Sequence, residues 1–325
     1  MTKSEFLALL VVLAVVILFP LTIFAYQYLY LPATYGPVKV INLWARVPQA
    51  GGWAPEVITV HKGDRVRLRL HSQDVVHGFA IGKMGVDAGP IYPGQVTAVD
   101  FVADQAGRFT YYCNVWCSPY HYRMRGILEV VDPVASQTFI AEEGRPQEVE
   151  AGLDIDAPHE AEFYPMAKPS AVRGAGIYVR ALQDRRPTFE GLGERSPSDV
   201  FYTLRREQAL GSLSDEELWD LVAYLWSQTT TPERLSLGRA LYEKNCAPCH
   251  GQTGGGDGPG GRYQKKEPAA FDQAQTMAGG TNAIYRAKIV RGGMGTGMPY
   301  WGPIFTDEEI ESLVGYLWTF LFSYE

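Results

Sequence analysis

The chain has 325 residues, enough for two or three domains, and its hydrophobic content of 46% is ordinary for protein that folds in water. Its formal net charge of −7 argues against a nucleic-acid-binding protein, for which a basic stripe is expected, and suits an encounter with a basic protein partner. The chain has only four cysteines, in two close pairs, and six histidines, which limits how many metal centres it can hold.

Residues 6–26 carry no charge and predict a membrane-spanning helix. A helix of this length extends about 31 Å, which covers a bilayer core of about 30 Å. Tyr26, Tyr28 and Tyr30 follow, as an interfacial aromatic belt would. The alternative is a cleaved signal peptide, but its apolar core would be shorter and would precede a small-residue cleavage site. We predict a retained anchor over residues 1–35, single-pass in the cytoplasmic membrane and surrounded by lipid, with the other domains on the extracytoplasmic side.

Residues 36–133 form short β-rich runs separated by turn signals such as Lys62-Gly63-Asp64. Many short strands at this spacing predict an all-β sandwich. The β-rich runs are residues 57–60, 66–70, 96–99, 109–112 and 127–130.

A Cys-x3-Cys-x3-His-x2-Met pattern follows the run at 109–112, and His77 lies upstream of it. Two thiolates on one loop can bridge two copper ions, each of which then binds one imidazole, and soft ligands of this kind suit copper. A mononuclear blue-copper site uses one cysteine and leaves the second without a role, and a disulfide leaves the histidines and the methionine unexplained. Zinc is the remaining alternative. The pattern therefore favours a dinuclear copper site.

This pattern resembles the CuA cupredoxin domain of subunit II of haem-copper oxidases, over about residues 55–132. Many members of that family have a glutamate where this chain has Val115, and the glutamate carboxylate helps to hold magnesium, which valine cannot do. The single anchor resembles B-type oxidases. The resemblance implies bridging by Cys113 and Cys117, with His77 and Met124 completing one copper and His121 and the backbone carbonyl of Val115 the other.

The same region also resembles the CuA domain of nitrous oxide reductase, in Phe101–Asp104, Tyr111–Cys113 and Met124–Gly126. That enzyme needs a second, histidine-rich copper cluster. Only three scattered histidines remain once the copper and haem ligands are assigned, namely His61, His71 and His159. We therefore predict that the chain holds no substrate-reducing centre and only transfers electrons.

Residues 134–170 are crowded with acidic side chains and prolines, and predict a solvated acidic linker, with a docking surface as the alternative. Beyond them the pattern is helical and contains a repeat. Residues 214–226 match residues 306–318 without a gap, at a spacing of 92 residues. Each copy begins with a capping box, Ser or Thr followed three residues later by Glu, and continues as an amphipathic helix.

The second copy of the repeat holds Cys246-Ala247-Pro248-Cys249-His250, the attachment signature of c-type haem. Its two thiols, within one helical turn, add to the haem vinyl groups, and the adjacent histidine binds the iron. A disulfide and a zinc half-site are the alternatives, but zinc requires further ligands and no second cluster lies nearby. The corresponding stretch of the first copy, Leu182–Arg186, has no cysteine or histidine. We predict that residues 171–230 are a degenerate, haem-less cytochrome c-like repeat, packed between the copper and haem domains.

Residues 231–325 resemble class I cytochrome c, including a Gly-x-Gly-Met-Pro loop. By this resemblance Met298 is the distal haem ligand, with Met294 the second candidate and Met277 the third. Histidine and methionine together raise the potential of haem iron, which suits electron delivery to a strong oxidant.

The sequence therefore predicts a multi-domain protein with one N-terminal transmembrane helix, an all-β cupredoxin sandwich and all-α cytochrome c-like domains, the first copy degenerate. Its expected cofactors are dinuclear CuA and covalently attached haem c. Electrons would pass from a soluble donor, such as a small cytochrome or copper protein, through haem c and CuA to a membrane catalytic subunit I. The favoured complex is a cytochrome c oxidase, and a nitric oxide reductase of the same superfamily and a stand-alone copper and haem redox module are the alternatives.

Overall fold

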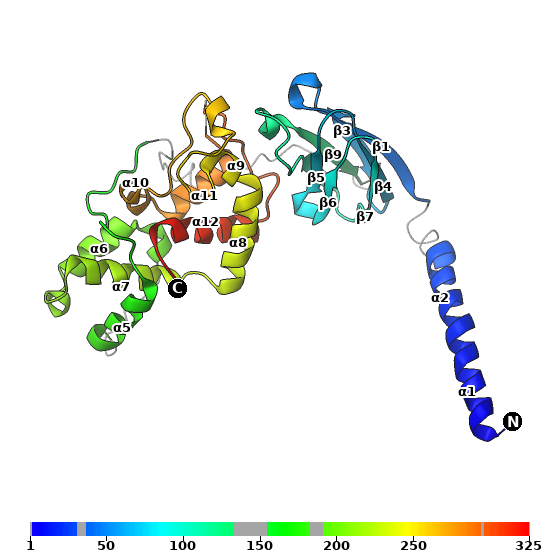
Figure 1. The fold of residues 1–325 in the computed structure, drawn as a ribbon, viewed down its shortest axis with the longest axis horizontal. Coiled ribbons are helices and arrows are strands. Elements are labelled where there is room, and N and C mark those ends of the chain that lie inside the picture. The colour runs from blue at the N-terminus through cyan, green and yellow to red at the C-terminus, as the bar shows by residue number, and fades with distance from the viewer. Residues whose placement is uncertain are drawn as a thin grey trace.

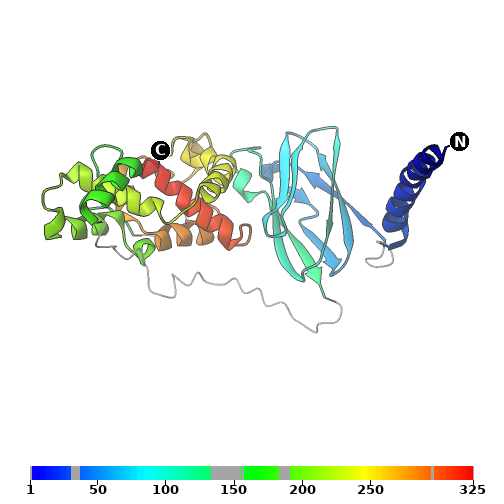
Figure 2. The same cartoon turned by 90° about the horizontal axis from the view of Figure 1, so that it is seen from below.

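The computed structural model of the chain describes residues 2–30, 37–132, 155, 157–182, 191–293 and 296–324. The β-sandwich lies between a protruding N-terminal helix and a larger helical part (Figure 1), and the view turned by 90° keeps this order (Figure 2). The predicted fold class, an apolar helix followed by a cupredoxin-like sandwich and a helical region with a cytochrome c domain, is confirmed.

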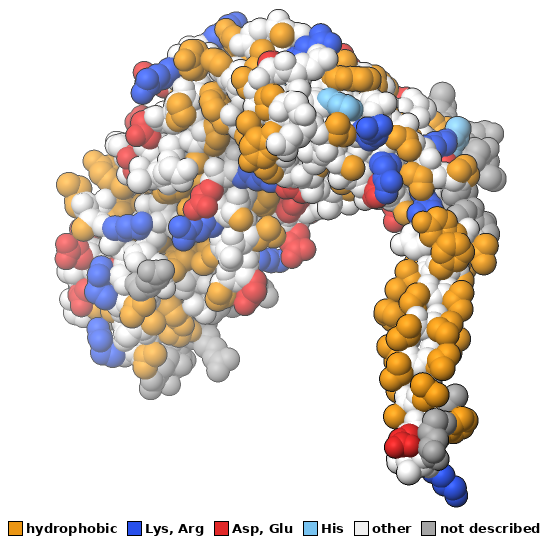
Figure 3. Space-filling model, turned by 45° about the vertical axis from the view of Figure 1, so that its right-hand side comes forward, with side chains coloured by type: hydrophobic (Ala, Val, Ile, Leu, Met, Phe, Trp, Pro, Cys, Tyr) orange, Lys and Arg blue, Asp and Glu red, His pale blue; other side chains and the backbone are white. Residues whose placement is uncertain are grey.

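The N-terminal helix runs without a break over Lys3–Tyr30, four residues beyond the predicted end. It is the one helix among the described residues that is long and apolar enough to cross a membrane, with a mean hydropathy of 3.1. Hydrophobic side chains cover its visible surface (Figure 3), as a bilayer span requires. Its consecutive parts are α1 (Lys3–Leu13), η1 (Ala14–Leu18), α2 (Phe19–Ala25) and η2 (Tyr26–Tyr30).

Two sheets form the sandwich, one in the order β2-β1-β4-β7 and the other in the order β3-β9-β8-β5-β6. In β4, Val66, Leu68 and Leu70 are buried while the arginines between them face outward, which is the alternation of a half-buried strand. The strands are β1 (Lys39–Ala45), β2 (Trp53–Ala54), β3 (Val57–His61), β4 (Arg65–Ser72), β5 (His77–Ile81), β6 (Val86–Ile91), β7 (Val96–Val102), β8 (Gly107–Tyr112) and β9 (Arg125–Val131), with 3-10 turns η3 (Pro48–Ala50), η4 (Gly82–Met84) and η5 (His121–Arg123).

The helical part packs around one apolar core to which both predicted repeats contribute. The two predicted capping boxes are confirmed, at Ser214 with Glu217 and at Thr306 with Glu309. Its helices are α5 (Ala171–Leu182), α6 (Pro197–Arg205), α7 (Asp215–Ser227), α8 (Pro232–Asn245), α9 (Ala247–His250), α10 (Ala274–Gly279), α11 (Asn282–Arg291) and α12 (Asp307–Leu321), with 3-10 turns η6 (Leu192–Glu194), η7 (Gln208–Leu210) and η8 (Gly261–Tyr263).

The same helix crossing occurs in both repeats. A β-carbon on Gly174 of α5 would overlap the Asp220 carbonyl of α7, and one on Gly238 of α8 would overlap the Ser312 carbonyl of α12. Asp220 and Ser312 are themselves 92 residues apart. One turn further on, an aromatic pair closes each crossing: Tyr178 with Tyr224 at 5.1 Å between ring centroids, and Tyr242 with Tyr316 at 5.3 Å. Of the stretch expected to match the haem motif, Leu182–Arg186, only Leu182 is among the described residues.

The predicted position of the first repeat, between the copper and haem domains, is wrong. α5, α6 and α7 lie at the end of the helical part farthest from the sandwich in both views (Figures 1 and 2). The copies instead meet through corresponding residues, Trp226 and Trp318, edge to face at 5.7 Å. Because the first repeat packs on this side of the second repeat, the other side of the second repeat can face the sandwich.

The end of the predicted acidic linker belongs to the helical domain. The Ala161 amide donates to the Gln275 carbonyl at 3.0 Å, and the Phe163 ring stacks on Tyr202 at 5.6 Å. Ala161 is also buried. Residues 157–170 are therefore attached to the helical domain, although Glu160 and Glu162 stay exposed to solvent, while residues 134–154 lie outside the described residues.

The helix crossing in the first repeat can be tested by adding one methyl group. Gly174→Ala should lower the melting temperature of the helical domain, because overpacking typically costs about 1–3 kcal/mol. Gly176→Ala, on the same helix, is the control: the nearest side chain would lie 3.7 Å away, and alanine favours a helix over glycine by up to about 1 kcal/mol. Calorimetry on both variants measures the difference, and equal stability would contradict the close crossing.

Candidate copper and haem sites

The predicted copper ligands lie on the loop between β8 and β9 and at the start of β5. The loop is closed at its base by the Cys113 amide, which donates to the Met124 carbonyl at 3.0 Å, and the indole of Trp53 donates to the same carbonyl at 3.3 Å. β5 pairs with β8, so His77 at the start of β5 faces this loop from a neighbouring strand. The turn η5 brings His121 back toward the cysteines.

The structure brings all six predicted copper ligands together. The ligand atoms of His77, Cys113 and Cys117 lie within 4.8 Å of one another. Metal–thiolate and metal–imidazole bonds of about 2.3 and 2.0 Å place two ligand atoms of one tetrahedral ion about 3.5 Å apart. The observed separations match: Cys113 Sγ to His77 Nδ1 3.9 Å, Cys117 Sγ to His121 Nδ1 3.5 Å, Cys117 Sγ to Met124 Sδ 3.8 Å and Cys113 Sγ to the Val115 carbonyl oxygen 3.1 Å.

The two thiols share their protons unequally. Burial alone would raise the pKa of Cys113, but hydrogen bonds with Cys117, His121 and His77 hold it well below its usual value. The hydrogen bond with Cys113, followed by burial, raises the pKa of Cys117. These shifts favour the thiolate form of Cys113, which is the form that binds a soft metal.

Asp74 positions the His77 ring, a role that the sequence analysis missed. Its Oδ1 lies 2.7 Å from Nε2 of His77, which directs Nδ1 toward Cys113. The carboxylate is itself held by the amides of Val47 and Val75, each at 2.7 Å. A carboxylate three residues before a candidate histidine ligand was the available signal, because ligand imidazoles commonly donate their other N–H to such a group.

The haem-attachment motif lies where α8 meets α9. His250 is buried, its ring stacks on Phe271 at 4.6 Å, and its Nδ1 lies 3.0 Å from the Ala269 carbonyl, which requires Nδ1 to carry the proton. This leaves Nε2 for iron, and burial lowers the pKa of His250 toward the neutral, ligating form. Burial raises the pKa of Cys246 to about 12, so this thiol stays protonated. These residues fit a covalently attached haem.

The predicted distal ligands Met298 and Met277 lie in different surroundings. Met298 is half-buried in the glycine-rich loop, where its amide donates to Thr296 Oγ1 at 3.2 Å. Met277 is fully buried in the apolar core and its sulfur lies 3.4 Å from the Tyr285 hydroxyl, so it already has a packing role. Met294 lies outside the described residues.

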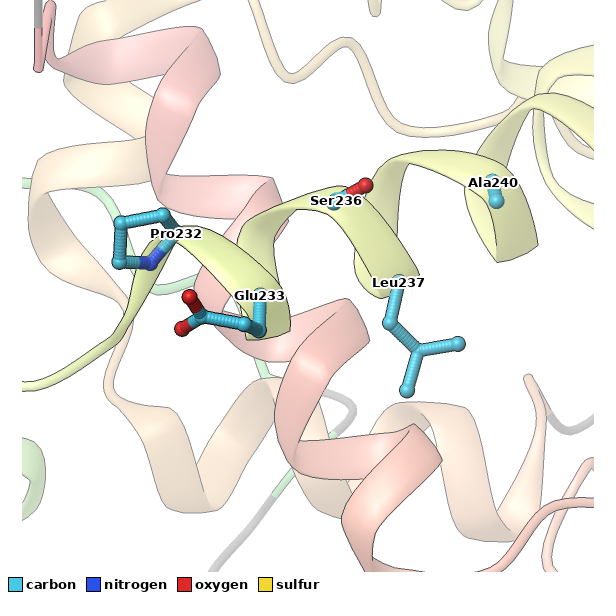
Figure 4. Close-up of a pocket in the computed structure, with 5 residues that line it drawn as sticks. All are labelled: Pro232, Glu233, Ser236, Leu237 and Ala240. Atoms are coloured by element: carbon cyan, nitrogen blue, oxygen red, sulfur yellow. The ribbon is translucent and has the colours of Figure 1, made fainter.

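A surface depression on α8 does not belong to either site. It is formed by residues of one exposed helix (Figure 4) and offers no thiol or imidazole. Its lining residues are Pro232, Glu233, Ser236, Leu237 and Ala240.

Two family models match the chain, one for each site. Residues 54–131 match the model for cytochrome c oxidase subunit II, periplasmic domain, and residues 233–317 match that for cytochrome c oxidase, cbb3-type, subunit III. The chain therefore joins a domain similar to subunit II to a domain similar to a cbb3-type cytochrome c, which agrees with the predicted resemblances to subunit II and to cytochrome c.

Curated relatives match each domain separately. Cytochrome c oxidase subunit 2 of Thermus thermophilus is 30% identical over 81 residues, 25% of this chain and 59% of the relative. Nitrous-oxide reductase of Stutzerimonas stutzeri is 34% identical over 85 residues, 25% of this chain and 13% of the relative. The cbb3-type cytochrome c oxidase subunit CcoP of Azospirillum sp. (strain B510) is 30% identical over 102 residues, 31% of this chain and 34% of the relative. The chain thus spans between 13% and 59% of these relatives.

Among solved structures, the periplasmic domain of subunit II of cytochrome oxidase from Bradyrhizobium japonicum is 21% identical, with a TM-score of 0.25, and the match covers 29% of this chain and 84% of that one.

Removing the Asp74 carboxylate should weaken copper binding. Asp74→Ala is expected to lower copper affinity by about 10–100-fold, because the His77 ring loses the partner that orients it. Asp100→Ala is the matched control, since that exposed carboxylate pairs with Arg67 on the other sheet. Competition against a copper chelator measures both, and equal affinities would show that Asp74 does not support the site.

The choice of distal ligand is tested by paired substitutions. Met298→Leu should change the haem absorption spectrum and lower its potential far more than Met294→Leu, because only the first removes an axial ligand. Spectra and redox titration of both variants give the answer. A larger effect at Met294 would reverse the assignment.

Proposed function

We propose that this chain is the electron-entry subunit of a respiratory haem-copper complex, passing electrons from a soluble donor through haem c and CuA to a catalytic subunit I. The observation that carries the proposal is the gathering of six copper-type donor atoms at the β8–β9 loop and the start of β5, in a chain that also holds a buried haem-attachment histidine. Thiolates that bridge two coppers spread one added electron over both, so the geometry changes little on reduction.

The chain itself transfers electrons and reduces no substrate. Within the described residues, the one group of three or more candidate metal-binding side chains of the kinds His, Cys, Asp and Glu is the copper cluster. His61 and His71 lie on strands of the sandwich: His61 contacts Lys39, and His71 contacts Asn42 and stacks on Trp44. In this proposal the terminal reaction belongs to a partner, and the helix Lys3–Tyr30 would hold this chain beside it in the cytoplasmic membrane.

The favoured complex is a cytochrome c oxidase, supported by the matches to subunit II and to a cbb3-type cytochrome domain. A nitric oxide reductase of the same superfamily is the second candidate. It is favoured by Val115, which cannot supply the magnesium-binding carboxylate, and by the similarity of the copper loop to that of a nitrous-oxide reductase.

Turnover by the intact complex, purified from membranes and supplied with a reduced small cytochrome, tests the proposal. We expect rapid oxygen consumption and slow loss of nitric oxide when each gas is supplied separately. The reverse result would establish the reductase. Purification of the chain from membranes without any catalytic subunit would contradict both and favour a stand-alone redox module.

Metal analysis of the purified chain tests the cofactors independently of turnover. The expected ratio of copper to iron is two to one, from one dinuclear site and one haem. A ratio of one to one would exclude the dinuclear site, and Cys117→Ser should lower copper content without changing iron.

A further inference from the structure

The copper loop lies directly against the haem domain. Arg125, the first residue of β9, donates through Nη1 to the Tyr300 carbonyl at 2.7 Å. Its guanidinium lies over two rings of the haem domain, 4.7 Å from the centroid of Tyr300 and 5.3 Å from that of Trp301. The edge of Trp301 meets the ring of Tyr112, which precedes the first copper-loop cysteine, at 6.1 Å. One arginine thus ties the base of the copper loop to the segment that follows Met298.

Two further contacts fix the domains close together. A β-carbon on Gly82 would overlap the Ile304 carbonyl, so the two backbones touch at this point. Lys244 of α8 contacts Asp87 of β6 at 2.5 Å, and Asp87 also accepts a hydrogen bond from the Asn114 side chain at 3.1 Å. Asn114 follows the first copper cysteine, and Lys244 lies just before the haem motif. The contacts of Asp87 with both residues therefore connect the two candidate sites.

Trp116 is part of this interface. It precedes Cys117 in the copper loop, and its ring centroid is 5.6 Å from that of His121. On its other side the ring packs against Gly260, where a β-carbon would overlap atom Cη2 of the indole. The Gly260 amide donates to the Pro248 carbonyl at 2.7 Å, and Pro248 lies between the two haem-attachment cysteines.

These contacts make a continuous path. It runs from the haem motif at Pro248, across one hydrogen bond to Gly260, by direct contact to the Trp116 ring, and on to the His121 ring. The copper loop also approaches the haem domain at a second place, between Tyr122 and Gly297. This contact is looser, since even a β-carbon added to Gly297 would lie 3.8 Å from the Tyr122 hydroxyl. Electronic coupling falls steeply across empty space, so the path through Trp116 is the better conductor.

We propose that Trp116 is the electron-transfer contact between the haem and copper domains. The proposal rests on the proposed function, since it assumes that both sites are filled. One electron leaves the haem and one enters the copper pair, and no atom or proton is transferred, so the step needs no other reactant. In this assignment Arg125 is a positioning residue that holds the interface closed.

The test follows electron redistribution within the isolated chain, loaded with both cofactors, after photoreduction of the haem. Trp116→Leu should slow this redistribution by about tenfold or more, because small displacements of reacting groups are costly. Trp116→Phe, which keeps an aromatic ring, should retain most of the rate. Trp44→Leu is the matched control, since Trp44 lies on β1 of the other sheet. If Trp116→Leu fails to bind copper, Gly260→Val displaces the ring from the haem domain while every residue of the copper loop keeps its identity.

A second readout separates conduction from docking. A protease site is inserted among residues 133–154, and the two halves of the cleaved chain are run on gel filtration. Slowed redistribution with unchanged spectra and co-eluting halves would support the proposal. An unchanged rate would overturn it, and so would separation of the halves in Trp116→Leu, which would make the indole a docking contact only.

The role of Trp116 can be tested even if the terminal reaction is assigned wrongly. Redistribution of an electron within one chain involves no oxygen or nitric oxide. A failed proposed function would appear earlier, as a missing copper or haem spectrum. Arg125→Ala should cause the two cleaved halves to separate on gel filtration. Arg67→Ala is the control and should not, because Arg67 forms an exposed ion pair on the other sheet of the sandwich. If the halves of the Arg125→Ala variant still elute together, Arg125 is not needed to hold the two domains in contact.

Discussion

The antiparallel pairing of β8 with β9 is the constraint on which the copper site and its contact with the haem domain depend. Its last register pair, Tyr112 with Arg125, fixes where the copper loop leaves and re-enters the sheet. The ligands on the loop between these two residues are therefore held close together by the loop itself. The same two residues face the haem domain, through Trp301 and the Tyr300 carbonyl. One strand pair therefore sets the shape of the copper site and the position of its neighbour.

The metal-binding chemistry could be predicted because its signals are local. The spacing of Cys113, Cys117, His121 and Met124 places four ligands on one loop, whatever the rest of the fold does. The haem motif is likewise contained in a single turn of helix. The spacing alone could not predict His77 as a ligand, because His77 reaches the cysteines only through the pairing of β5 with β8. The resemblance to a known domain supplied this prediction. Asp74 was missed because a carboxylate near a histidine is common and only the folded geometry shows it aimed at the ring.

The errors concern packing between distant segments. The repeat was recognised from its capping boxes and its spacing of 92 residues, but its position was not, because the contact between Trp226 and Trp318 leaves no local pattern. The linker prediction missed the attachment of residues 157–170 for the same reason. The acidic side chains Glu160 and Glu162 are exposed, as a solvated segment predicts, but contacts of Ala161 and Phe163 with distant residues hold the segment on the helical domain. The Arg125–Tyr300 hydrogen bond spans 175 positions and could not have been read from either segment alone.

Joining two redox domains in one chain has a different consequence when they also dock. A flexible tether raises the effective concentration of one domain at the other, but each transfer would still require an encounter. Contacts such as those of Arg125, Lys244 and Trp116 replace that encounter with a fixed arrangement. They also occupy the surface of the haem domain around Gly260. Under the proposed function, a soluble donor would therefore approach the haem domain from another side, and entry and exit of the electron would be separated on the surface of one small domain.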